Sequence, residues 1–320
     1  MVKNKFSFAA KEVFLQLPVW FIVFTALQIT HINMVKTPIP HPQFIWTAVF
    51  PLFWVYLFLN SRIKKGDVSD PEAYKLAILL PALAAIFILA VIWPHAPREY
   101  DRLLYEHEVT TAVWVVLLMI HCLATRGWKG LVVFFGVGLL YGALLESSGV
   151  TMDFFREHGY HLYAPGFLRK IFSAPAVTIF GWTTVFYPAI FVIDALLPGR
   201  SKIYRAVSAS MIGLFIDLQV DPVATASGLW SWNPDLPAGF LGVPILNFVS
   251  WFWAVAVFAY AYYFVMEKSF WSAQKKIGVL VLLIPVCQAA AGLGLFGTMA
   301  ALEGFSGPSW KILIKSIIHK

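Results

Sequence analysis

The sequence predicts an all-α fold, a polytopic bundle of about eight to nine transmembrane helices. Of its 320 residues, 59% are apolar and only 13% are charged, whereas soluble domains average about 25% charged residues. The mean hydropathy is +0.73. The apolar residues form long continuous runs, unlike the alternating segments of about ten residues that build an outer-membrane barrel. A chain of this composition needs lipid as its solvent.

A helix of about 20 apolar residues crosses a bilayer, and nine runs come close to this length. We expect all of residues 1–320 to form one integral-membrane domain. The predicted spans are 13–31, 43–60, 76–93, 109–125, 130–149, 175–197, 206–220, 246–266 and 277–300.

The distribution of cations predicts the orientation. If the N-terminus is cytoplasmic, 15 of the 24 Lys and Arg residues lie on the cytoplasmic side, as the positive-inside rule expects. We therefore predict a protein of the cytoplasmic membrane with a cytoplasmic N-terminus. The loops 94–108, 150–174 and 221–245, which are rich in carboxylates and aromatic residues, then share the opposite side.

The segment 217–251 carries the clearest candidate site. It contains no Lys, Arg or His. Asp217 and Asp221 are four residues apart, on one face of a predicted helix that we expect to end at Asp221, because Pro222 follows. Two carboxyl groups this close in apolar surroundings resist joint ionisation, so one can keep a proton for a weak base such as an alkene. The alternative is a pair of helix-end acids that face water.

Glu146 supplies a third carboxyl group from a distant part of the chain. Gly138, Gly142 and Glu146 recur every four residues, on one helix face. Small residues at this spacing let a neighbouring helix approach closely. We therefore expect Glu146 to point into the bundle, where ionisable groups usually have a role. The alternative is a solvated Glu at the membrane interface.

Aromatic residues accompany these acids. Their ring faces can line a pocket and stabilise a cation, or they can form an aromatic belt at the membrane interface. The candidates for the pocket are Trp230, Trp232, Trp251, Tyr141 and Tyr163.

Other kinds of site have less support. His158 and His161 lie in a mixed aromatic and charged loop, which we interpret as an amphipathic segment in the headgroup layer. Cys122 and Cys287 fall in apolar runs, and no Cys/His spacing typical of a metal site is present. The net charge of +7 comes from cations in short loops, where membrane topology explains them without nucleic acid.

The spacing of these residues resembles the membrane carotenoid biosynthesis protein family, which includes carotenoid 1,2-hydratases and bisanhydrobacterioruberin hydratases. The resemblance covers roughly residues 80–265. It departs at Ser250, where the family pattern leads us to expect Gly. The downstream motif consists of Asp217, Asp221, Pro222, Gly228, Leu229, Trp230, Ser231, Trp232, Gly242, Val243, Pro244, Asn247, Phe248 and Trp251, and the upstream one of Glu146, Gly149, Val150, Tyr160 and Tyr163.

The resemblance implies hydration of a terminal isoprenoid double bond, with no redox cofactor and no metal. An acid protonates the alkene and water captures the carbocation, with Asp217 or Asp221 as the acid and Glu146 as its partner or as the base for water. The substrate would be a lipophilic polyene or polyprenyl chain from the bilayer, and membrane lipids and other enzymes of carotenoid synthesis would be the partners. The implied substrate-binding residues are Trp230, Trp232, Tyr163, Tyr141, Asn247 and Trp251.

Two other functions fit the same residues. In an end-group cyclase, an internal alkene rather than water would capture the carbocation. In a transporter or lipid-binding membrane protein, the three carboxyl groups would relay protons or cations. Transport predicts an inverted repeat with broken helices in both halves, and the sequence shows neither clearly.

Overall fold

The chain forms two compact units, which we describe separately. The smaller comprises Met1–Arg98 with Phe191–Gly199, and the larger comprises Glu99–Ile190 with Arg200–Lys320. The computed structural model describes residues 10–25, isolated positions between 56 and 79, and residues 100–151, 160–171, 174–237 and 239–312.

In the smaller unit, residues 10–25 are helical apart from a turn at Gln16, which agrees with the first part of the predicted span 13–31. The predicted spans 43–60 and 76–93 lie almost entirely outside the described residues. The expected total of eight to nine spans therefore stays a prediction.

The remaining helices confirm the all-α membrane class. Within the described residues, five helical stretches, His107–Gly149 among them, are long and apolar enough to cross a membrane. The helices are α6 (Tyr100–Leu131), η4 (a π-helix, Val132–Val137), α7 (Gly138–Thr151), α8 (Ala176–Leu196), α9 (Lys202–Ala226), α10 (Ile245–Met266) and α11 (Ala273–Glu303).

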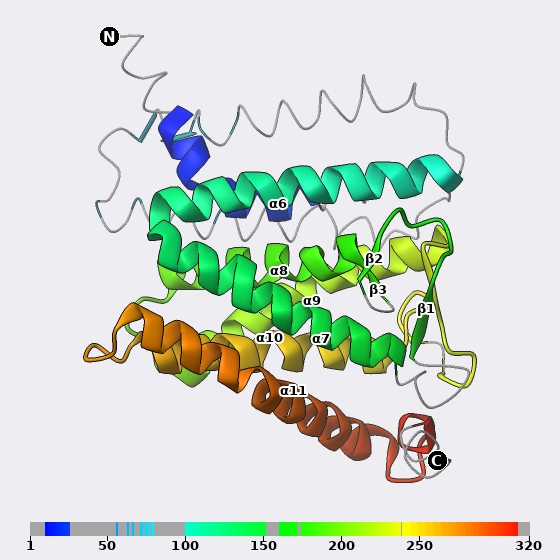
Figure 1. Ribbon diagram of the computed structural model, residues 1–320. Coiled ribbons are helices and arrows are strands. Elements are labelled where there is room, and N and C mark those ends of the chain that lie inside the picture. Colours follow the sequence, from blue (N-terminus) through cyan, green and yellow to red (C-terminus); the bar gives the residue numbers. More distant parts are fainter. Residues whose placement is uncertain are drawn as a thin grey trace. The chain divides into compact units, whose positions relative to one another are not determined.

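The stretch His107–Gly149 is two antiparallel segments. Its 43 residues would extend about 65 Å as one helix, about twice the thickness of the hydrocarbon core. Gly127 breaks the helical path with φ 68° and ψ −175°. Figure 1 shows the chain reversing between α6 and α7. This break falls in the predicted loop between the spans 109–125 and 130–149.

The prediction that α9 ends at Asp221 is wrong. The helix continues through Pro222 to Ala226, and Gly228, with φ 74°, then turns the chain away. Proline inside a membrane helix is tolerated where neighbouring helices pack around the weakened backbone, and α9 packs extensively against α10. Asp221 therefore lies more than one turn inside the helix, and neither it nor Asp217 is a water-facing acid at a helix end.

The face of α7 that carries Gly138, Gly142 and Glu146 points into the bundle, as predicted. A Cβ at Gly142 would lie 2.8 Å from the Trp182 Cβ and 3.1 Å from the Ile179 carbonyl oxygen of α8. At Gly138 the same atom would make ordinary contacts of 3.5–3.6 Å with two Phe rings. The absence of a side chain at Gly142 therefore permits the close approach of α7 and α8.

In the described part of the chain, two short antiparallel ribbons add to the predicted helices. Strand β1 (His161–Tyr163) pairs with β4 (Trp230–Trp232), and β2 (Lys170–Ile171) pairs with β3 (Ala174–Pro175). The β1–β4 ribbon joins the loop after α7 to the chain that follows α9. Figure 1 shows β1 beside the C-terminal end of α7.

We predict that Gly142→Ala destabilises the protein by about 1–3 kcal/mol, because the added methyl group overpacks the contact with α8. Thermal unfolding in detergent measures this loss. Gly138→Ala is the matched control, because its added methyl group makes only ordinary contacts. Equal unfolding temperatures for the two variants would contradict the close packing at Gly142.

Candidate functional site

The β1–β4 ribbon brings four aromatic rings onto one face. His161 lies opposite Trp232, and Tyr163 lies opposite Trp230. Because side chains alternate along a strand, these pairs share a face and Leu162 points to the other. Ring centroids are 5.5 Å apart for His161 and Trp232 and 5.9 Å apart for Tyr163 and Trp230. The pairing therefore delivers one imidazole and one phenol to the same side of the ribbon.

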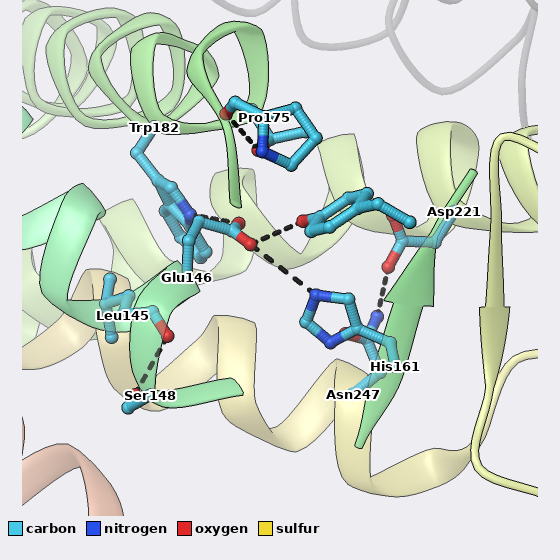
Figure 2. Close-up of polar contacts among 10 residues, drawn as sticks. Leu145, Glu146, Ser148, His161, Pro175, Trp182, Asp221 and Asn247 are labelled. Atoms are coloured by element: carbon cyan, nitrogen blue, oxygen red, sulfur yellow. Dashed lines mark hydrogen bonds and ion pairs between the residues drawn. The ribbon is translucent and has the colours of Figure 1, made fainter. Parts of the chain in front are cut away.

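Glu146, in the last turns of α7, accepts hydrogen bonds through both carboxylate oxygens. Trp182 Nε1 of α8 donates to Oε1 over 2.6 Å, and the Tyr163 hydroxyl donates to Oε2. His161 Nε2 lies 3.6 Å from Oε2. Figure 2 shows Trp182 of α8 and His161 of the ribbon converging on Glu146. Glu146 therefore points inward, as predicted, and its partners there are Trp182, Tyr163 and His161.

Tyr163 is well suited to remain a donor. Burial and the negative charge of Glu146 hold the pKa of the Tyr163 phenol well above its ordinary value. Both causes disfavour the phenolate, which would place a second negative charge beside the carboxylate. The phenol therefore stays protonated across the physiological pH range and keeps its hydrogen bond to Glu146.

Asp217 and Asp221 form a second carboxyl group cluster on α9. Both are buried, at 0% and 4% exposure. The Asn247 side-chain Nδ2 of α10 lies 3.0 and 3.1 Å from the two Asp217 oxygens and also donates to Asp221 Oδ2. The two carboxyl groups are close enough to share a hydrogen bond with each other. One amide therefore holds the pair in place.

The two clusters are neighbours. Asp221 interacts electrostatically with His161 and with Glu146, and the Tyr163 phenol also senses the charge of Asp221. Figure 2 shows the His161 ring between the Glu146 carboxylate and the Asn247–Asp221 pair. Glu146 and Asp221, predicted from two distant segments, thus flank one imidazole.

A cavity of about 650 Å³ adjoins this cluster, within the usual range of about 300–1,000 Å³ for small-molecule sites. Tyr163 lines this cavity, and its hydroxyl also donates to Glu146. Thr225, one turn beyond Asp221, also lines it and accepts a 3.0 Å hydrogen bond from Trp232 Nε1. The other lining residues are Leu162, Ala164, Pro165, Gly228, Trp230, Ser231, Trp232, Asn233, Pro234, Leu236, Gly242 and Pro244.

Two of the aromatic candidates lie away from the cavity wall. Tyr141 is fully buried, and its ring stacks on Phe186 and Phe258 at centroid distances of 5.7 Å each. Trp251 packs on Trp182 at 4.5 Å, so it supports the indole that donates to Glu146. Tyr141 therefore contributes to the packing of α7 against α8 and α10. Trp251 supports Trp182, which donates to the Glu146 carboxylate.

Sequence reasoning missed two residues of this site. His161 is mostly buried in the polar cluster, rather than in a headgroup-layer segment, and its alternation with Tyr163 was the available signal. Nothing in the sequence singles out Trp182 among 13 Trp residues. Within the described part of the chain, no three His, Cys, Asp or Glu side chains are grouped to hold a metal ion.

The fold and the site define a membrane helical protein with a buried cluster of acids beside an aromatic-lined cavity. A family model described as carotenoid biosynthesis protein matches residues 107–309. The chain belongs to this family, and its role is in carotenoid biosynthesis. The matched residues include the Glu146 and Asp217–Asp221 clusters. No curated protein and no solved structure matches the chain.

We predict that Asn247→Ala lowers stability by about 1–3 kcal/mol, because the buried Asp pair loses its amide donor. Ser250→Ala, one turn further along α10, is the control, since its hydroxyl donates only to the Asn247 backbone carbonyl in the described structure. Thermal unfolding in detergent compares the two variants. A loss at Asn247 no larger than that at Ser250 would contradict the bridging role of the amide.

Proposed function

We propose that this protein is a hydratase that adds water across the terminal double bond of an acyclic carotenoid end group. The observation that carries the proposal is the buried Asp217–Asp221 pair, held by Asn247 beside Glu146 and His161. In our proposal the Asp pair supplies the acid, and the side of the cluster that carries Glu146 supplies the base, beside the aromatic-lined cavity. Membership of the carotenoid biosynthesis family supplies the substrate class.

Asp221 is our proposed proton donor. A buried pair of carboxyl groups resists double ionisation, so it retains one shared proton. Asp217 is fully buried and is bonded to Asn247, whereas Asp221 also faces His161 and Glu146. Asp217 and Asn247 therefore act as positioning groups. Asp221 transfers the proton to the CH carbon of the double bond and leaves a tertiary carbocation.

The surroundings favour such a cation. Ring faces of Trp230, Trp232 and Tyr163 border the cavity, and aromatic faces attract positive charge. The ionised carboxylates add to this attraction. The cavity holds the branched end of the polyene, while the rest of the chain stays in the lipid of the cytoplasmic membrane. The reaction is redox-neutral and needs no redox cofactor.

Capture of the cation by water completes the proposed reaction, with the Glu146 side of the site serving as the basic side. The Tyr163 and Trp182 donors hold Glu146 as a carboxylate, and Tyr163 also lines the cavity. The proposed acid on α9 and the Glu146 carboxylate on α7 thus lie on two different helices. Other enzymes of carotenoid synthesis would be the partners of this protein, and the polyene would enter the site from the bilayer.

Expression in cells that accumulate lycopene or γ-carotene tests the proposal. We expect a carotenoid heavier by one water per modified end, detected by mass spectrometry of the extracted pigment. A new isomer of unchanged mass would instead indicate an end-group cyclase. No change with any acyclic end group tried would contradict the carotenoid hydratase.

Replacement of each acid tests the assignment of roles. We predict that Asp221→Asn reduces hydration by about 10²–10⁴-fold, the usual contribution of a general acid. Asp217→Asn should cost less, because Asp221 keeps its carboxyl group. Pigment analysis at matched levels of inserted protein measures both, with Gly138→Ala as the control. A larger loss at Asp217 than at Asp221 would reverse the assignment.

A further inference from the structure

His161 is a buried basic group at the centre of the acid cluster. The Nε2 atom of His161 is enclosed and makes no hydrogen bond within the described residues. It lies 3.6 Å from Glu146 Oε2, and the ring also interacts with Asp221. Figure 2 shows it between these two acids. An imidazole in this position can exchange a proton with either side.

The backbone around His161 is shaped to accommodate it. Pairing with β4 sets its direction, because His161 lies opposite Trp232 and on the same face as Tyr163. Gly149, near the end of α7, leaves the space that the ring occupies, since a Cβ there would lie 2.9 Å from His161 Cε1. Two elements that are separate in the sequence therefore fix one imidazole against Glu146.

Glu146 itself is poorly placed to take a proton from water. Its Oε1 already accepts from Trp182, and its Oε2 accepts from Tyr163. These donors favour the carboxylate and orient it. A fixed carboxylate beside an imidazole orients the ring and stabilises the imidazolium that forms when the ring takes a proton.

We infer that His161 is the catalytic base that deprotonates the attacking water and then returns the proton to Asp221. This inference rests on the proposed hydratase function. Glu146 is the positioning residue for the ring. His161 thereby connects the basic side of the site to its acidic side.

The steps balance without an added reactant. The alkene π electrons take the Asp221 proton, which forms a C–H bond and leaves the tertiary cation and an Asp221 carboxylate. A lone pair of water forms the C–O bond, and the O–H bond breaks as the His161 imidazole takes the proton. The imidazolium then passes this proton to the Asp221 carboxylate. The net change is the addition of one water, and both groups regain their starting state.

Deuterium labelling separates this role from a structural one. Membranes that contain the full chain are supplied with lycopene in D₂O, and hydration is measured together with deuterium uptake at the vinyl CH carbon of recovered lycopene. We expect His161→Gln to reduce hydration by about 10²-fold or more while deuterium uptake persists. In this variant the cation still forms, but no base deprotonates the attacking water. The cation therefore loses a proton and regenerates the alkene, which now carries deuterium. Asp221→Asn should abolish both signals.

Gly149→Ala gives a second variant that leaves the imidazole in the chain. Its added methyl group must displace the His161 ring, so the ratio of hydration to deuterium uptake should fall as in His161→Gln. Gly138→Ala, on the same helix, is the matched control and should keep the wild-type ratio.

Three results would overturn the inference. Wild-type hydration in His161→Gln would show that His161 is not the base. A parallel loss of hydration and deuterium uptake in His161→Gln would show that the residue acts before the cation forms, or that it only supports the site. Wild-type protein that neither hydrates nor labels any acyclic polyene would remove the proposed function, and the inference with it.

Discussion

Burial of three carboxyl groups inside membrane-spanning helices is the constraint on which the rest of this structure depends. An ionisable group at such depth is costly unless other groups bind it, and each acid here has dedicated partners. Asn247 of α10 holds Asp217 and Asp221, and Trp182 of α8 donates to Glu146. The need for these donors explains why α7 approaches α8 so closely and why α9 packs against α10.

The β1–β4 ribbon satisfies the rest of this requirement and also builds the cavity. It carries the Tyr163 hydroxyl to Glu146 and places Trp230 and Trp232 on the same face. Because side chains alternate along a strand, a slip of one residue would turn His161 and Tyr163 away from the acids. Five of the six paired residues, all except His161, line the cavity, so the register of a three-residue strand links the acid cluster to the space for a ligand.

In the proposed reaction, this arrangement provides an acidic side and a basic side within a few side chains. Asp217 and Asp221 lie close together, and the Asn247 amide of α10 binds both of them. The proximity of the two carboxyl groups favours a retained proton. Glu146 has donors on both oxygens, which favours the carboxylate. In our proposal these different surroundings give the carboxyl groups different roles, and His161, between Glu146 and Asp221, passes the proton.

The sequence by itself determined the membrane-helical class, because the bilayer demands internally bonded helices and apolar runs record this directly. Local periodicity also determined that Glu146 continues the Gly138 and Gly142 face and that Asp217 and Asp221 share another. Only the tertiary structure decided that α9 continues through Pro222, that His161 is buried in the site, that Trp182 binds Glu146, and that Tyr141 stacks on Phe186 and Phe258. Those outcomes depend on contacts between segments far apart in the chain, and helix and strand periodicity cannot predict such contacts.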